Sequence, residues 1–218
     1  MKKRLLIIPL VILISACDRN ENTDSVVEVY RADVFSALTT YDAELIKARN
    51  ELSFENGALV RNCDAYIKAS KTSRVSEGVN NMIISAEYLM CDALSLVGKS
   101  RKLQQTDKAE TAEVLASKLD LRSFPSSHYQ RLDDKKHTLG TLSDKVVIDG
   151  SEASIDTGDW HFSLVHVASG DINNNGKADW IIWLIDEAKV GNYRGYVTLV
   201  AYDVDLSKAL IQAKPVSN

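Results

Sequence analysis

The hydrophobic residues of this chain change their spacing once, and that change restricts the folds open to it. From about residue 26 to residue 123 they recur at steps of three and four, the period of an amphipathic helix. After Leu142, short runs of β-branched and aromatic residues are separated by glycine, asparagine and aspartate. Helices followed by strands predict an α+β fold, with an N-terminal helical hairpin or bundle packed on a C-terminal antiparallel β-meander. The expected regions are a helical one at 26–124 and a β-rich one at 125–218.

The helical region contains three apolar stripes and a shorter fourth helix. The polar segment 70–78 ends in glycine and is expected to connect the second stripe to the third. Asp107 and Glu110 can form a capping pair, so the fourth helix should begin there. Pro125 should end it, because proline disfavours helix at the residue before it. The three stripes consist of Val34, Leu38, Tyr41, Leu45, Ala48 and Leu52; of Leu59, Cys63, Tyr66 and Ile67; and of Val79, Ile83, Ala86, Met90, Ala93, Leu94 and Val97.

The β-rich region is expected to hold a meander of short strands with the helices over one face. Trp160, Phe162 and Leu164 alternate with polar residues, which predicts a strand with one buried face. The run 180–185 is apolar on both faces, as expected of a central strand covered on both sides. The expected strands are 146–148, 160–167, 179–185 and 196–204.

The first sixteen residues have the form of a secretion signal. Residues 2–4 are basic, residues 5–14 are apolar, and Ser15 and Ala16 are small residues placed before a cleavage point. The alternative is an N-terminal anchor helix. The apolar stretch is too short for that, since a membrane-spanning helix needs about 20 residues.

The segment 14–17 (ISAC) resembles the lipobox of bacterial lipoproteins. The resemblance implies that Cys17 is acylated with palmitate-type chains and becomes the mature N-terminus, which would anchor the protein firmly to a membrane. Asp18 resembles the inner-membrane retention signal of enterobacterial lipoproteins, although Arg19 is not among the neighbours that strengthen it. Residues 18–25 are all polar and predict a tether. We therefore expect a lipid-anchored protein of the cell envelope that faces the periplasm, with the inner membrane favoured.

The charge of the chain argues against nucleic-acid binding. The formal net charge is −4, and removal of the three cations at residues 2–4 leaves about −7. A mildly acidic protein without a basic stripe binds phosphate backbones poorly.

Cys63 and Cys91 are the pair that remains once Cys17 is acylated. Export places them in an oxidising compartment, where an even pair predicts a disulfide. The alternative is two buried thiols that act as small hydrophobic residues. A bond between them would cross-link a helical hairpin.

The segment 171–179 (DINNNGKAD) places oxygen-bearing side chains at alternate positions around a glycine. Calcium prefers six to eight oxygen ligands at about 2.3–2.6 Å. Asp171, Asn173, Asn175 and Asp179 would supply side-chain oxygens, and Lys177 would supply its carbonyl. The pattern is similar to the calcium loops of dockerins, and more closely to the FG-GAP-type loops of integrins and related β-proteins, in which the loop joins two strands. The resemblance implies a structural Ca²⁺ site.

The same loop departs from the EF-hand pattern, because Ile182 occupies the place of the bidentate glutamate. It also carries two amides where the similar loops usually carry more aspartates, so calcium would bind weakly, at about 10⁻⁴–10⁻³ M. The alternative is a metal-free turn in which asparagine and glycine adopt left-handed conformations.

Other candidate sites lack the spacing of a catalytic motif. The histidines follow no zinc-ligand pattern, and the chain contains neither a nucleophile elbow nor a P-loop. We expect the Asp186–Glu187 pair to form a solvated turn at a strand end. The segment 192–196 (NYRGY) fits either a recognition loop or an ordinary hairpin tip. The four histidines are His128, His137, His161 and His166.

Two classes of function follow from these observations. The first is a non-catalytic, lipid-anchored protein that binds another envelope protein, such as an inhibitor or an immunity-like protein. The second is a periplasmic hydrolase acting on the cell wall or on a small molecule. A cleft that gathers His161 or His166 with a carboxylate would favour the hydrolase. A broad apolar patch without such a cluster would favour the binding protein.

Overall fold

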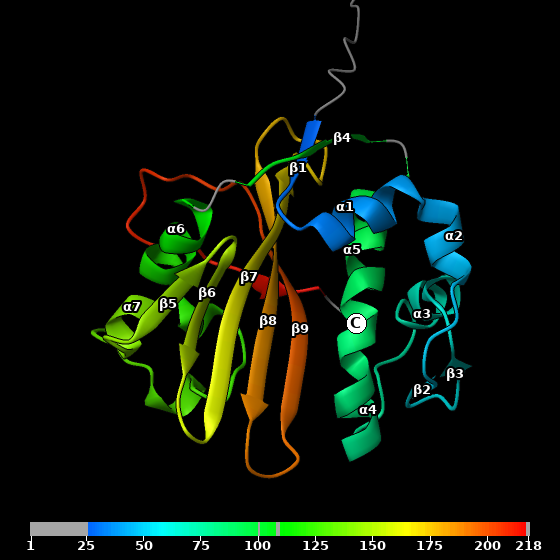
Figure 1. Cartoon of the computed structure of the whole chain (residues 1–218), viewed down its shortest axis with the longest axis horizontal. Coiled ribbons are helices and arrows are strands. Elements are labelled where there is room, and N and C mark those ends of the chain that lie inside the picture. Colours follow the sequence, from blue (N-terminus) through cyan, green and yellow to red (C-terminus); the bar gives the residue numbers. More distant parts are fainter. Residues whose placement is uncertain (1–25, 100, 108–109, 217–218) are drawn as a thin grey trace, which may run out of the picture.

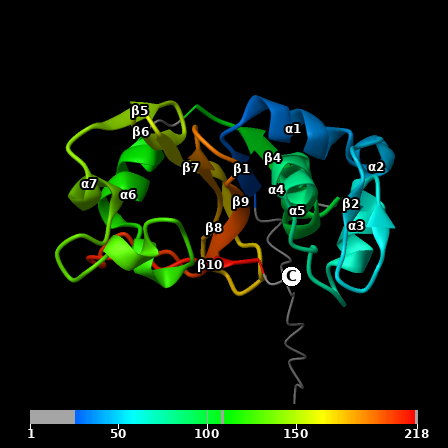
Figure 2. The ribbon, with the colours of Figure 1, turned by 90° about the horizontal axis from the view of Figure 1, so that it is seen from below.

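The computed structural model describes residues 26–99, 101–107 and 110–216. These residues form one mixed sheet of eight strands that stands between two groups of helices (Figure 1). In Figure 2, α6 and α7 lie on one side of the sheet, and α1, α4 and α5 lie on the other. The predicted α+β class is confirmed in this form. The signal segment 1–16, the lipidation candidate Cys17 and the tether to residue 25 lie outside the described residues.

The strands of the large sheet follow the order β10-β9-β8-β7-β1-β4, and β6, which also pairs with β5, pairs with β7. No helix within the described ranges is long and apolar enough to cross a membrane. The strands are β1 Val26–Val29, β4 Lys102–Gln105, β5 Val146–Asp149, β6 Glu152–Asp156, β7 Trp160–Gly170, β8 Asp179–Ala188, β9 Arg194–Ala201 and β10 Lys214–Pro215, with β2 Leu52–Ser53 and β3 Leu59–Val60 in a separate two-stranded sheet. The helices are α1 Ala32–Thr39, α2 Tyr41–Ile46, α3 Cys63–Ala69, α4 Val79–Ile84, α5 Leu89–Val97, α6 Glu110–Lys118 and α7 Leu139–Leu142, and the 3-10 helices are η1 Ser85–Tyr88, η2 Leu121–Ser123 and η3 Tyr129–Arg131.

Strand β8 lies inside the sheet and is covered on both faces. Ile181 and Trp183 belong to the core shared with α1, α3 and α5, whereas Ile182 and Leu184 belong to the core shared with α6 and α7. The prediction of a central strand covered on both sides is confirmed. Helices cover both faces of the sheet, because the apolar stripe of α6 packs against the second face.

The structure does not show the predicted N-terminal helical hairpin or bundle as a unit separate from the sheet. Strand β1 pairs in parallel with β4 and antiparallel with the end of β7, so both N-terminal strands extend the C-terminal sheet. Val27 and Val29 are fully buried and alternate with Glu28, which is the period of a strand. Over only four residues this alternation does not stand out from a helical pattern.

The first predicted helix stripe breaks twice before Leu52. The carbonyl of Ser36 accepts hydrogen bonds from the hydroxyls of Thr39 and Thr40 and from the backbone N–H of Thr40. Threonine hydroxyls compete in this way with the regular helical pattern, and α1 ends there. Helix α2 then ends at Ile46, and Leu52 lies in β2 instead.

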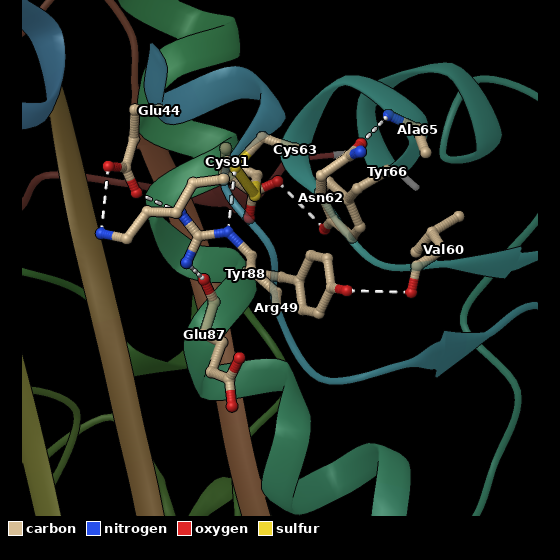
Figure 3. The surroundings of a disulfide bond; sticks show 12 residues. Glu44, Arg49, Val60, Asn62, Cys63, Ala65, Tyr66, Glu87, Tyr88 and Cys91 are labelled. Carbon is tan, nitrogen blue, oxygen red and sulfur yellow. Dashed lines mark hydrogen bonds and ion pairs between the residues drawn. A yellow bond between two sulfur atoms is a disulfide. The ribbon is translucent and has the colours of Figure 1, made fainter. Parts of the chain in front are cut away.

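The predicted disulfide is present and joins α3 to α5 (Figure 3). The Cα atoms of Cys63 and Cys91 are 4.9 Å apart, and both residues are fully buried. Figure 3 shows the guanidinium of Arg49 beside this bond, where Nε donates to Cys63 Sγ at 3.3 Å and NH2 pairs with Glu44 at 2.5 Å. The cross-link therefore lies within a packed polar and apolar network between the helices.

Candidate binding site

A cavity of about 540 Å³ lies between the segment 127–143 and the neighbouring strands β6 and β7. Apolar and aromatic side chains form one part of its lining, and charged or hydroxyl-bearing side chains form the other. A largely apolar pocket with a few placed polar groups is the usual form of a ligand site. The lining residues are Ser127, His128, Arg131, Lys136, Leu142, Ser143, Ile155, Thr157, Asp159, Trp160 and Phe162.

The polar side of the cavity is a loop that is held by its own turns. Asp133 Oδ1 accepts the backbone N–H groups of Lys135 and Lys136, both at 2.7 Å. The Thr138 side chain caps α7 in a capping box, and the His137 carbonyl accepts the N–H of Leu121 at 2.8 Å. These bonds fix both ends of the loop against the helices over the sheet.

Asp186 of β8 fixes the wall of the cavity. Its carboxylate is 1% exposed and accepts the backbone N–H and the hydroxyl of Ser127, both at 2.7 Å. The indole N–H of Trp160 donates to it at 2.7 Å, and the hydroxyl of Tyr193 donates at 3.2 Å. Three separate chain segments therefore meet at one buried carboxylate, which satisfies its need for donors.

The expectation that Asp186 and Glu187 form a solvated turn is wrong. Strand β8 continues to Ala188, so Asp186 lies inside the sheet opposite Gly195. A Cβ atom at position 195 would lie 3.1 Å from the Tyr193 hydroxyl, so glycine leaves room for that side chain to reach the carboxylate. Two acidic residues after an apolar run look the same in a sequence whether the strand continues or ends.

The cavity lining carries two cations that form no ion pair in the described structure. Arg131 and Lys136 are exposed, and neither forms an ion pair with a residue of the described ranges. His128 packs on Phe162 with ring centroids 4.9 Å apart, and burial holds the pKa of its imidazole below the ordinary value. The histidine is therefore neutral at pH 7, and Asp159 is the one carboxylate among the lining residues.

Aromatic side chains extend from the cavity wall to the surface. Trp160 stacks on Tyr193 with ring centroids 5.4 Å apart, and burial beside Asp186 raises the pKa of Tyr193 to about 12. Tyr193 is nevertheless 41% exposed, and Val190 in the same hairpin is 75% exposed. The segment 192–196 thus includes the end of the β8–β9 hairpin, and its first tyrosine belongs to the rim of the cavity.

The histidines that could have indicated a hydrolase do not line this cavity. His161 lies within ion-pair distance of Asp156, at 3.6 Å, and of Glu152, at 4.0 Å, but it is not among the residues that line the cavity. Ser163, which donates to Glu152, is fully buried and closed to a substrate. His166 is also fully buried, and its burial lowers the imidazole pKa to about 3.

The segment 171–179 joins β7 to β8, as its resemblance to strand-connecting loops implies. Its side-chain oxygens accept hydrogen bonds from the backbone of the same loop, as a metal-free Asx turn requires. Asn174 and Gly176 have positive φ angles of 61° and 83°. The bonds are Asn175 N–H to Asp171 at 2.8 Å and to Asn173 at 3.1 Å, Gly176 N–H to Asp171 at 2.8 Å, Lys177 N–H to Asn175 at 3.0 Å, and Ile172 and Asn173 N–H to Asp179 at 3.0 and 3.2 Å.

Asp203 places a third carboxylate beside this loop. The sequence did not indicate it, because it lies 24 residues after Asp179. It accepts from Asn175 at 2.6 Å and pairs with Lys177 at 2.8 Å, and the lysine holds the Asp203 pKa below its usual value. In the described part of the chain, no group of three or more His, Cys, Asp or Glu side chains is arranged to hold a metal. Each oxygen of Asp171 accepts only one of these bonds and keeps a lone pair. Calcium binding therefore stays a prediction.

Comparison with protein-family models, with curated proteins and with solved structures finds no match to this chain.

Proposed function

We propose that this chain is a lipid-anchored protein of the bacterial cell envelope that faces the periplasm and binds another envelope protein without catalysis. The surface around the 540 Å³ cavity is the proposed docking site, and an acidic side chain of the partner would enter it. Such a protein would act as an inhibitor or an immunity-like protein of its partner.

One observation carries the proposal: Arg131 and Lys136 form no ion pair in the described structure, and they share the cavity lining with the half-buried Trp160, whose ring stacks on the exposed Tyr193. Arginine, tyrosine and tryptophan are the residue types that dominate the energy of protein interfaces. The buried bonds of Asp186 hold Trp160 and Tyr193 in place before a partner arrives. Such preorganisation lowers the entropy lost on binding.

The chemistry around the cavity supports binding rather than hydrolysis. Ser127 donates its hydroxyl to Asp186 and not to a histidine, so no imidazole is placed to take its proton. His128 packs its ring against Phe162. The hydrolase alternative would require a nucleophile and a base in contact, and this cavity does not supply that pair.

The test is affinity capture of the full chain from its own envelope, followed by titration against the captured protein. The double variant Arg131→Gln/Lys136→Gln should bind at least tenfold more weakly, because each charged hydrogen bond contributes roughly 1.5–3 kcal/mol. Lys135→Gln is the matched control, since this neighbouring lysine does not line the cavity. The proposal is contradicted if the double variant binds the captured protein with the affinity of wild type. It is also contradicted if wild type captures no protein that the double variant fails to capture.

A further inference from the structure

A second cavity, of about 580 Å³, lies between the helices and strand β9, apart from the proposed docking site. Its walls are mostly apolar and include Leu52, Leu89 and Val197. The chain reaches the cavity again at its end, where the N–H of Val216 donates to the carbonyl of Thr198 at 2.9 Å. The cavity is thus enclosed by a helical layer, a strand and the C-terminal segment.

Asp92 of α5 is the only carboxylate among the residues that line this cavity, and it is 9% exposed. The hydroxyl of Tyr66 donates to its Oδ1 at 3.0 Å. The Thr198 hydroxyl beside it also favours the ionised form, yet makes no close hydrogen bond with a described residue. No lysine, arginine or histidine of the described ranges forms an ion pair with Asp92.

This arrangement leaves the negative charge of Asp92 without a cation in a desolvated place. Burial raises the pKa of the carboxyl to about 6, so it is still mostly ionised at pH 7. A buried charge is costly unless it is paired, and two neutral hydroxyls do not replace a cation. Asp186 differs, because four donors from three segments surround it.

Arg74 carries a charge opposite to that of Asp92 and lies at the exposed side of the same cavity. It is the one cationic residue of the lining, and its guanidinium has no ion pair within the described residues. A ligand with a cation at one end and an anion at the other would neutralise both groups. An apolar body between them would match the walls.

We propose that this second cavity binds a small zwitterion whose two charges are separated by an apolar body, such as an ω-amino acid or a short apolar peptide, with its ammonium paired with Asp92 and its carboxylate facing Arg74. The ammonium would donate to the Asp92 carboxylate, and its remaining donor capacity suits the free lone pairs of the Thr198 hydroxyl. This site is independent of the partner-binding surface, since the two cavities share no lining residue.

Three probes of matched length test the proposal on the full chain: 6-aminohexanoate, hexylammonium and hexanoate. Calorimetric titration should give saturable binding of the first, weaker binding of the second and none of the third. Asp92→Asn keeps an acceptor for Tyr66 but removes the charge, and should weaken both amines at least tenfold. Arg74→Gln should reduce the affinity for 6-aminohexanoate to that for hexylammonium and leave hexylammonium unchanged.

The proposal is overturned by no saturable binding of either amine, by equal binding of hexanoate, or by unchanged binding of the amines to Asp92→Asn. Far-ultraviolet circular dichroism and a melting curve establish that each variant is folded. If Asp92→Asn does not fold, two measurements still test the proposal: the binding of hexanoate compared with the two amines, and the affinity of Arg74→Gln for 6-aminohexanoate. Unchanged affinity of Arg74→Gln for 6-aminohexanoate overturns the orientation and with it the zwitterion assignment.

Discussion

Asp186 and Asp92 are both buried carboxylates, but they differ in what surrounds them. Asp186 accepts four hydrogen bonds from Ser127, Trp160 and Tyr193, whereas among the described residues Tyr66 alone donates a close hydrogen bond to Asp92. A satisfied buried carboxylate joins chain segments together, and an unsatisfied one lowers stability until a ligand pairs with it. Neither environment could be predicted from the sequence, because each is made by residues that are distant along the chain.

Asp186→Ala should lower the free energy of unfolding by about 3 kcal/mol or more, because it leaves several buried donors without an acceptor. Urea unfolding followed by tryptophan fluorescence measures the change. Asp144→Ala, at an exposed aspartate of the same region, should stay within about 0.5 kcal/mol of wild type. Equal losses in the two variants would contradict the role given to Asp186.

Asp92 and His166 should make stability depend on pH in opposite directions. The Asp92 pKa is raised from 3.8 to about 6, so its favourable contribution is complete below pH 4 and is lost as pH rises through 6. The His166 pKa is lowered from 6.5 to about 3, so its contribution is present above pH 6.5 and is lost as pH falls toward 3. The two effects overlap and partly cancel in wild type.

The difference in the free energy of unfolding between wild type and Asp92→Asn isolates the contribution of Asp92. Between pH 4 and 7, the variant should gain up to roughly 3 kcal/mol relative to wild type, which is the free energy of a pKa difference of this size. His166→Phe should instead remove the loss of stability below pH 6. Urea midpoints measured at several pH values test both, and parallel curves for wild type and Asp92→Asn would refute the assignment.

At the scale of single elements, prediction succeeded where an element is long and strongly patterned. The strands 160–167 and 179–185 were expected close to their observed positions, because alternation and a continuous apolar run persist over many residues. Strands β1 and β4 were missed, since four residues carry too little pattern and their pairing partners lie far along the chain. The candidate cavity was missed for the same reason, because its walls come from a polar loop and two strands.

The loop 171–179 is the predicted calcium site. Millimolar Ca²⁺ should raise the melting temperature by a few degrees relative to chelator, since tenfold excess over Kd stabilises the folded state by about 1.4 kcal/mol. Magnesium should do less, being smaller and slower to lose its water. Asp171→Ala should remove the difference between calcium and chelator. No difference in wild type at several millimolar calcium leaves the metal-free turn.

The disulfide between Cys63 and Cys91 joins α3 to α5. Reduction, or the double variant Cys63→Ala/Cys91→Ala, should lower the stability of the fold by about 3–4 kcal/mol, because the unfolded chain loses a loop closure of 28 residues. Mass spectrometry of non-reduced protein isolated from its own cells should find no alkylatable thiol at either position. Two free thiols there would contradict the bond, and an unchanged melting temperature on reduction would contradict its stabilising role.

At the scale of the whole molecule, the N-terminal and C-terminal halves share one sheet. Strands β1 and β4 come from the first half, and β1 pairs directly with β7 of the second. The two cores lie on opposite faces of β7 and β8, so the backbone of the same two strands supports both cores. The predicted regions 26–124 and 125–218 therefore contribute to one structural unit.

The cysteine content of the whole chain bears on where the molecule resides. The chain has three cysteines, and the bond between Cys63 and Cys91 leaves Cys17 as the odd one. An odd cysteine directly after a predicted secretion signal is available for acylation, as the resemblance to a lipobox implies. Cys17→Ser should therefore accumulate as an unprocessed precursor that takes up no labelled palmitate, while Cys63→Ala/Cys91→Ala should still be labelled. If Cys17→Ser is processed and retained in the membrane fraction like wild type, the lipid anchor and the envelope location built on it are both wrong.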